Sequence, residues 1–163
     1  MNLFSTSPLW MLAVLAAVLI AAMIQDATQL RISNVLTGLV LALALAAMIV
    51  SGPTIDLWEN FVVFAVVLGI GTLLFSRGML GGGDVKLFAA VGLWSDLRTA
   101  IGLVSTILIA GGVLALVMVA YRMARGKGIR KRSEAGGIPY GVAIGIGTML
   151  TAYMAVSMGS AVG

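Results

Sequence analysis

The sequence predicts an all-α membrane protein with six transmembrane helices and both termini on the outer side of the membrane. Of its 163 residues, 61% are hydrophobic and 10% are charged, whereas soluble domains average about 45–50% apolar and about 25% charged residues. This composition excludes a soluble enzyme, a disordered chain and a nucleic-acid-binding module. Five stretches without a charged residue are each long enough, or nearly so, to cross about 30 Å of hydrocarbon: 1–25, 32–55, 60–76, 99–121 and 135–163.

The distribution of basic residues decides the number of spans. If the segment 84–97 crosses the membrane, nine of the ten Lys and Arg residues lie on one side and Arg98 alone lies on the other. If it does not cross, the basic loop 122–137 faces away from Arg31 and Arg77. Because Lys and Arg concentrate on the cytoplasmic side, six spans are favoured. The predicted spans are 8–25, 34–50, 59–76, 84–97, 99–121 and 138–158.

Short local signals support the ends and the packing of these helices. Ser7–Pro8 is typical of a helix cap followed by the first helical residue. The Ser-Gly-Pro segment at 51–53 predicts the outer turn between the second and third spans. The triglycine at 81–83 precedes the fourth span and permits a close backbone approach. In the last span, the repeat of Gly141 and Gly145 predicts close helix packing.

Aromatic residues and the net charge of +4 agree with this topology. Aromatic belts mark the two membrane interfaces, and the chain places three tryptophans near the outer end and two tyrosines near the inner end of the predicted spans. The basic loop 122–137 is predicted to orient the protein and to contact anionic lipid, so the positive charge does not indicate nucleic-acid binding. The aromatic residues are Trp10, Trp58, Trp94, Tyr121 and Tyr140.

The chain contains no Cys and no His. Their absence excludes a disulfide, a thiol nucleophile, a Ser-His-Asp triad and a His-ligated zinc site. We therefore predict no metal and no cofactor, and any catalysis must use carboxylates, Lys, hydroxyl or backbone groups.

Two aspartates adjoin predicted spans instead of lying in loops. Asp26 follows the first apolar run and Asp84 begins the fourth span, and the topology places both at the cytoplasmic end. Ionisable residues at membrane depth are costly and usually functional. The alternative is that each carboxylate only marks a helix boundary, with Asp84 as a helix N-terminal residue.

As a pair, the aspartates can form a two-carboxylate catalytic site. Two close carboxylates share one proton, so one group activates water while the other protonates the carbonyl oxygen of an amide. A helix N-terminus favours the ionised form of a carboxylate, which suggests Asp84 as the base. Asp26, near a helix C-terminus, is then the acid.

Three segments resemble the motifs of the type IV prepilin peptidases. The run from Gly81 to Leu87, Gly-Gly-Gly-Asp-Val-Lys-Leu, resembles the family's Gly-x-Gly-Asp-x-Lys-Leu signature. Asp26 with the later Ile-Ser-Asn at 32–34 resembles an Asp about six residues before Ile-Pro-Asn. The segment 138–141, Ile-Pro-Tyr-Gly, resembles the start of the family's last span. The three motifs occur in the family's order.

The resemblance implies an aspartic endopeptidase of a prokaryotic cytoplasmic (inner) membrane, which cuts the basic leader from prepilins at the cytoplasmic face. Asp26 and Asp84 match the catalytic pair, and the residues expected to bind substrate or support the motifs are Gly81, Gly83, Lys86, Asn34 and Pro139. Larger members use zinc-binding cysteines and also N-methylate the product. The absence of Cys makes this chain similar to the short, peptidase-only members that serve tight-adherence (Flp) pili, or to the archaeal preflagellin peptidases.

Three points stay open at this stage. Ser33 stands where the family motif has Pro, which is expected to loosen the turn after Asp26 without removing activity. Lys86 either extends its amine to the interface or contacts a Glu downstream of the cleavage point in the prepilin. The alternative function is a non-catalytic membrane transport or assembly protein in which Asp26 and Asp84 bind protons or ions.

Overall fold

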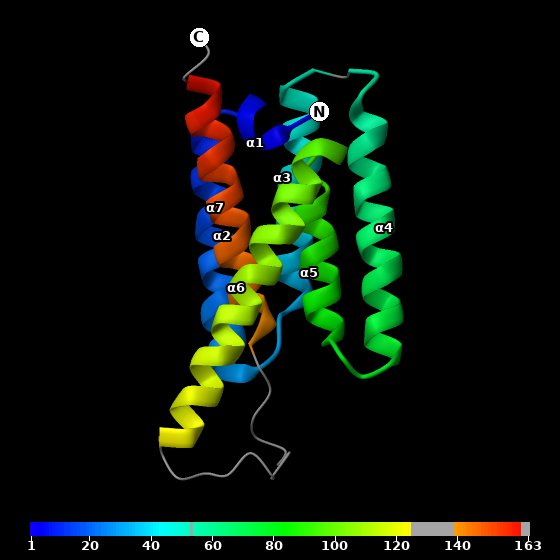
Figure 1. The fold of residues 1–163 in the computed structure, drawn as a ribbon. Coiled ribbons are helices and arrows are strands. Elements are labelled where there is room, and N and C mark those ends of the chain that lie inside the picture. The colour runs from blue at the N-terminus through cyan, green and yellow to red at the C-terminus, as the bar shows by residue number, and fades with distance from the viewer. Residues whose placement is uncertain (53, 125–138, 161–163) are drawn as a thin grey trace.

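The structure is a computed structural model that describes residues 1–52, 54–124 and 139–160. All regular structure in these ranges is helical and forms a bundle (Figure 1). The helices α2 to α7 run alternately up and down, so the N-terminus and the end of α7 lie at the same end of the bundle. The helices are α1 (Leu3–Thr6), α2 (Leu9–Gln29), α3 (Asn34–Val50), α4 (Leu57–Ser76), α5 (Gly82–Gly92), α6 (Leu97–Ala124) and α7 (Tyr140–Ser160).

Four of these helices, α2, α4, α6 and α7, are long and apolar enough to cross a membrane, and α3 is a shorter apolar helix. The predicted all-helical fold is therefore confirmed, and the long apolar helices support a membrane protein. The number of six spans and the placement of both termini on the outer side of the membrane stay predictions. The predicted span 84–97 differs from the structure, because α5 has only 11 residues. At about 1.5 Å per residue, α5 covers roughly half of the hydrocarbon thickness. Nearly all of the loop 122–137 lies outside the described residues.

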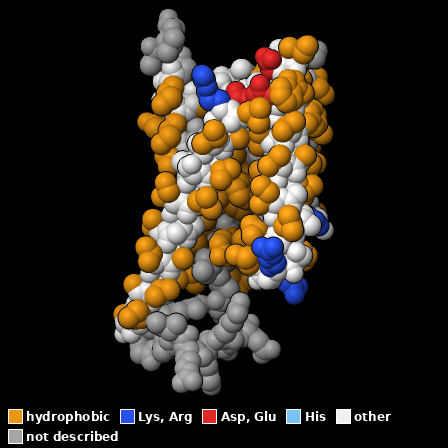
Figure 2. All heavy atoms as spheres, turned by 45° about the vertical axis from the view of Figure 1, so that its right-hand side comes forward, with side chains coloured by type: hydrophobic (Ala, Val, Ile, Leu, Met, Phe, Trp, Pro, Cys, Tyr) orange, Lys and Arg blue, Asp and Glu red, His pale blue; other side chains and the backbone are white. Residues whose placement is uncertain are grey.

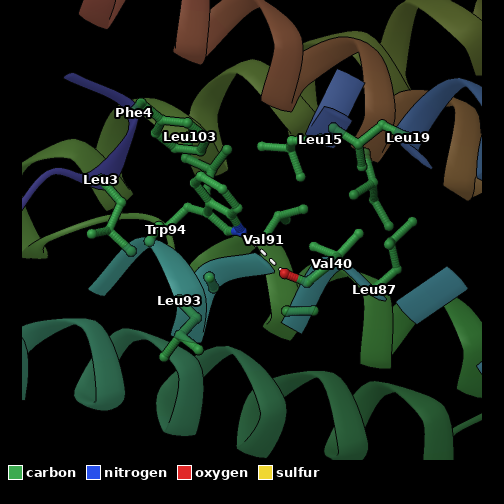
Figure 3. Close-up of a cluster of buried hydrophobic side chains, with 14 of the residues drawn as sticks. Leu3, Phe4, Leu15, Leu19, Val40, Leu87, Val91, Leu93, Trp94 and Leu103 are labelled. Carbon is green, nitrogen blue, oxygen red and sulfur yellow. Dashed lines mark hydrogen bonds between the residues drawn. The ribbon is translucent and has the colours of Figure 1, made fainter. Parts of the chain in front are cut away.

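The short helix α1 brings Leu3 and Phe4 next to Trp94, beyond the end of α5 (Figure 3). Leu3 and Phe4 are buried, and the ring of Phe4 stacks on Trp94 at a centroid distance of 5.8 Å. The Leu3 N–H donates to the Trp94 carbonyl at 3.0 Å. The indole N–H of Trp94 donates to the Val40 carbonyl at 3.3 Å. Trp94 is thus a core residue, and its predicted place in an interfacial belt is wrong.

The other two tryptophans, Trp10 and Trp58, are exposed in the structure, as an interfacial position requires. The N-terminal cap of α2 also differs from the prediction. Pro8 is the cap residue, and no side chain makes a capping hydrogen bond there. The α2 helix therefore starts with an apolar residue, Leu9, and without the predicted serine cap.

Glycines of α7 allow this helix to pack closely against α2 and α6. The α7 helix packs against both α2 and α6, and α5 packs against both α3 and α4. A Cβ on Gly145 would overlap the side chain of Met23 on α2, and one on Gly147 would lie 2.7 Å from the Ile107 backbone on α6. The predicted close packing of the last helix is confirmed at Gly145.

Candidate active site

Asp26 and Asp84 lie at the same end of the bundle. The α2 helix ends there and carries Asp26 one turn before its last residue, while α5 begins there and carries Asp84 in its first turn (Figure 1). The Asp26 side chain is 3% exposed, and Asp84 is half-buried. The up-and-down topology therefore brings together two residues that are far apart in the sequence.

The N-terminus of α7 holds the carboxylate of Asp26. The Gly141 N–H donates to Asp26 Oδ2 at 2.7 Å, and the Val142 N–H also bonds to this carboxylate. Pro139 begins this turn, since its carbonyl accepts from the Val142 N–H at 3.1 Å. The first turn of α7 thus presents its backbone donors to Asp26, although 115 residues separate Gly141 from it.

Asp84 is held by the loop before its own helix. The Gly81 N–H donates to Asp84 Oδ2 at 3.2 Å. A Cβ on Gly81 would lie 2.6 Å from the same oxygen, and a Cβ on Gly83 would lie 3.1 Å from the carbonyl oxygen of Ile32. The triglycine therefore allows the close approaches expected from the sequence, to the aspartate on one side and to the α2–α3 connection on the other.

Ile32 connects the two aspartate positions. Its backbone lies against Gly83, next to Asp84, and its Cδ1 atom would be 2.7 Å from a Cβ on Gly141. The Ile32 side chain is 9% exposed, so it is packed between the first turns of α5 and α7. Each of those turns holds one of the two carboxylates.

The helix ends do not distinguish the two aspartates in the way that the sequence suggested. Asp84 lies in the first turn of α5, as predicted. Asp26 is near the C-terminus of α2 but accepts its hydrogen bond from the N-terminus of α7. Both carboxylates therefore face the N-terminus of a helix, and the predicted assignment of Asp84 as base and Asp26 as acid loses its basis.

The electrostatic environment of Asp84 couples it to Asp26. Asp84 lies outside the four helices that are long enough to cross a membrane. Burial of the carboxyl and, to a lesser extent, the negative charge of Asp26 together raise its pKa from 3.8 to about 6, against the opposing effect of the hydrogen bond from the Gly81 N–H. A carboxyl whose pKa responds to the charge of a second carboxyl can share a proton with it.

This raised pKa predicts a pH-dependent stability. Between pH 3.8 and about 6 the folded protein binds more protons at Asp84 than the unfolded chain does, so its contribution to stability falls as the pH rises through about 6. The Asp84→Asn variant lacks this titration. In detergent, its melting temperature relative to wild type is expected to be higher at about pH 7.5 than at about pH 4. A difference that does not change with pH would contradict the shift.

Lys86 and Asn34 form a pair beside the aspartates. The Lys86 ammonium donates to Asn34 Oδ1 at 3.0 Å, across two different helices, and both side chains are exposed. The α3 helix begins at Asn34 and carries it at the same end of the bundle as Asp84. The structure thus joins two of the predicted site residues in one contact.

Ser33 has local partners that explain its presence at the position of the expected Pro. Its Oγ accepts from the Leu36 N–H at 3.3 Å and caps α3. Its own N–H donates to Gln25 Oε1 at 2.8 Å. A proline could make neither bond, since it has no N–H and no hydroxyl. The predicted loosening of the turn is therefore offset by two hydrogen bonds.

The sequence did not predict the contacts that three residues make in this site: Gln25, Ile32 and Gly141. Nothing in the local pattern marked Gln25, and Ile32 stood within the motif at 32–34 without a contact assigned to it, because the glycines that it packs against lie in other segments. Gly141 stood within a recognised motif, but its contact with Asp26 depends on the packing of α7 on α2. In the described part of the chain, no group of three or more His, Cys, Asp or Glu residues could hold a metal ion.

Comparison with known proteins identifies a family. The family model described as the type IV leader peptidase family matches residues 13–120, about two thirds of the chain. This range contains both aspartates, the triglycine, Asn34 and Lys86, and it ends before Pro139. No curated protein and no solved structure matches the chain.

Proposed function

The chain belongs to the type IV leader peptidase family, and on this premise we propose that it is a membrane-embedded aspartic endopeptidase. Its substrates are prepilins of type IV or Flp pili, and it removes their basic leader peptide at the cytoplasmic face of a prokaryotic inner membrane. The observation that carries the proposal is the placement of Asp26 and Asp84 at one end of the bundle. There each carboxylate accepts a hydrogen bond from a backbone N–H at the start of a helix, and the negative charge of Asp26 raises the pKa of Asp84.

The proposed reaction needs one proton on the pair. The protonated carboxyl donates a hydrogen bond to the carbonyl oxygen of the scissile amide, and the ionised carboxylate takes a proton from water as its oxygen attacks the carbonyl carbon. The tetrahedral intermediate then breaks at the C–N bond, and a carboxyl proton passes to the leaving amine. Because the two groups titrate as a unit, either aspartate can start as the base.

The supporting residues have separate tasks in this proposal. Gly81 and Gly83 let the Asp84 carboxylate and the Ile32 backbone approach the start of α5, and Pro139 closes the first turn of α7, which holds Asp26. Asn34 fixes the Lys86 ammonium. The reaction requires no metal or cofactor, and we propose no N-methylation of the product, since the chain has no Cys.

The distribution of charge supports a cytoplasmic site. In Figure 2, acidic side chains gather at one end of the visible face, beside a basic group, and basic side chains lie at the other end. Arg77 and Lys86 lie at the end that carries the aspartates, since α4 ends and α5 begins there. Positive charge marks the cytoplasmic side. We also propose that anionic lipid is the partner of the basic loop 122–137.

The test is co-expression with a prepilin, with leader removal read as a mobility shift and the cleavage point located by mass spectrometry. Wild type is expected to shorten the prepilin, and the variant carrying both Asp26→Asn and Asp84→Asn is expected to leave it intact. Processing by the double variant would overturn the proposal. A folded chain that never processes prepilin would favour the alternative, proton or ion binding by the aspartates in a transport or assembly protein.

Lys86 offers a test of substrate recognition. We propose that its ammonium, held by Asn34, binds the carboxylate of a Glu downstream of the cleavage point. Lys86→Gln is expected to raise KM about ten-fold for a prepilin with that Glu, because a hydrogen-bonded charge pair contributes roughly 1.5–3 kcal/mol. The same variant should barely affect a prepilin with Gln there. An equal loss on both substrates would contradict the contact.

A further inference from the structure

The side chain of Gln25 closes the turn between α2 and α3. Gln25 precedes Asp26 on α2, and its Oε1 accepts the Ser33 N–H at 2.8 Å, eight residues along the chain. The Leu30 N–H also returns to α2, donating to the Asp26 carbonyl at 2.9 Å. The turn from Leu30 to Ser33 is therefore tied at both ends to the part of α2 that carries Asp26.

This turn has an unfavourable backbone conformation that its surroundings maintain. Leu30 has φ 51° and ψ 36°, in the left-handed region, and among the described residues it is the one non-glycine residue with a positive φ. Side chains disfavour this region, and such conformations persist where surrounding contacts fix them. The Gln25–Ser33 hydrogen bond is a contact that fixes this one.

The turn carries Ile32 to the place where α5 and α7 begin. A Cβ on Gly83 would lie 3.1–3.3 Å from three Ile32 atoms, and a Cβ on Gly141 would lie 2.7 Å from its Cδ1. Gly83 precedes Asp84, and Gly141 donates its N–H to Asp26. Ile32 therefore lies against both of the segments that hold the two carboxylates.

We propose that Gln25 is a positioning residue that fixes the separation of Asp26 and Asp84, acting through the Leu30–Ser33 turn and Ile32. Its importance for catalysis rests on the proposed function, whereas its effect on geometry does not. Gln25 does not touch the reacting atoms in this proposal; it holds the turn that spaces them.

The hydrogen bond between Gln25 and Ser33 can be tested by a double-mutant cycle in which proline, which has no N–H to donate, replaces Ser33. Ser33 has φ −71°, which proline accepts, and Ser33→Pro removes the N–H that Gln25 binds. In the wild-type background, Gln25→Leu is expected to lower kcat about ten-fold with little change in KM. This loss is smaller than the roughly hundred-fold cost of a displacement of about 1 Å, because the rest of the turn still restricts the aspartates. In the Ser33→Pro background, the same change is expected to leave kcat nearly unaltered. Equal losses in both backgrounds would overturn the proposal.

A spin-label distance tests the geometry without any substrate. Since the chain has no Cys, labels at Ala27→Cys and Met79→Cys, both exposed, report the separation of the α2 end from the loop before α5. Gln25→Leu is expected to broaden this distance distribution, and Gln25→Glu, which keeps an acceptor oxygen, is expected to restore its width. The matched control is Gln29→Leu, an exposed glutamine of the same helix, which should change neither distance nor kcat.

The two readouts separate failure of this inference from failure of the proposed function. If wild type cleaves no prepilin, the peptidase proposal fails and the label distances alone decide the role of Gln25. If wild type cleaves prepilin and Gln25→Leu does not broaden the label distance distribution, the positioning role is overturned while the peptidase proposal stands.

Discussion

Replacing Asp84 with Asn is expected to lower prepilin cleavage at least about a hundred-fold, since general acid–base catalysis by one group contributes roughly 10²–10⁴-fold and the remaining carboxyl has no partner with which to share its proton. The amide oxygen of Asn can still accept the Gly81 N–H that now bonds to Asp84 Oδ2. The fold is therefore expected to survive while the proton transfer is lost. Asp26→Asn is expected to have a similar effect, because its amide oxygen can accept the Gly141 N–H.

The matched control is Asp56→Asn. Asp56 is an exposed carboxylate that begins α4 without a side-chain capping bond, at the opposite end of the bundle from Asp84. This variant is expected to cleave prepilin at the wild-type rate. Initial rates on one purified prepilin in detergent, with circular dichroism of each variant, make the comparison. A folded Asp84→Asn variant with more than about a tenth of wild-type activity would be incompatible with general acid–base catalysis by the pair.

The sequence predicted the helices from apolar length and charge, and it failed where helix length depends on tertiary contacts. The apolar residues from Leu87 to Ser95 are consistent with a span, but α5 ends at Gly92. The chain can end α5 early because Trp94 is covered by Phe4 of α1 and bonded to the Val40 carbonyl. No local pattern predicts that a helix of four residues packs two buried side chains beyond the end of α5.

The candidate site shows the same division between local and distant information. Asp26 and Asp84 could be selected because carboxylates are rare in apolar chains and because topology alone places them at one end. The donors to Asp26 come from α7, and a sequence does not show which helix start packs against which carboxylate. The pairing of Lys86 with Asn34 depends equally on the contact between α3 and α5.

Gly141 is the residue at which this packing controls the chemistry most directly. A Cβ at this position would lie 2.8 Å from Asp26 Oδ2 and 2.7 Å from Cδ1 of Ile32. The Gly141 N–H already lies 2.7 Å from the same oxygen, so α7 is close to the carboxylate. An added methyl group must displace either Asp26 or the first turn of α7.

The Gly141→Ala variant is therefore expected to lose about a hundred-fold in kcat, the cost of a misplacement of about 1 Å. Its stability is expected to change less, because overpacking costs about 1–3 kcal/mol and alanine recovers about 1 kcal/mol of helix propensity over glycine. Gly38→Ala is the control, since Gly38 lies within α3 and a Cβ there meets nothing within 4 Å. It should retain wild-type kcat and melt slightly higher. If Gly141→Ala matched Gly38→Ala in both kcat and melting temperature, α7 could not be the element that holds Asp26 in place during the reaction.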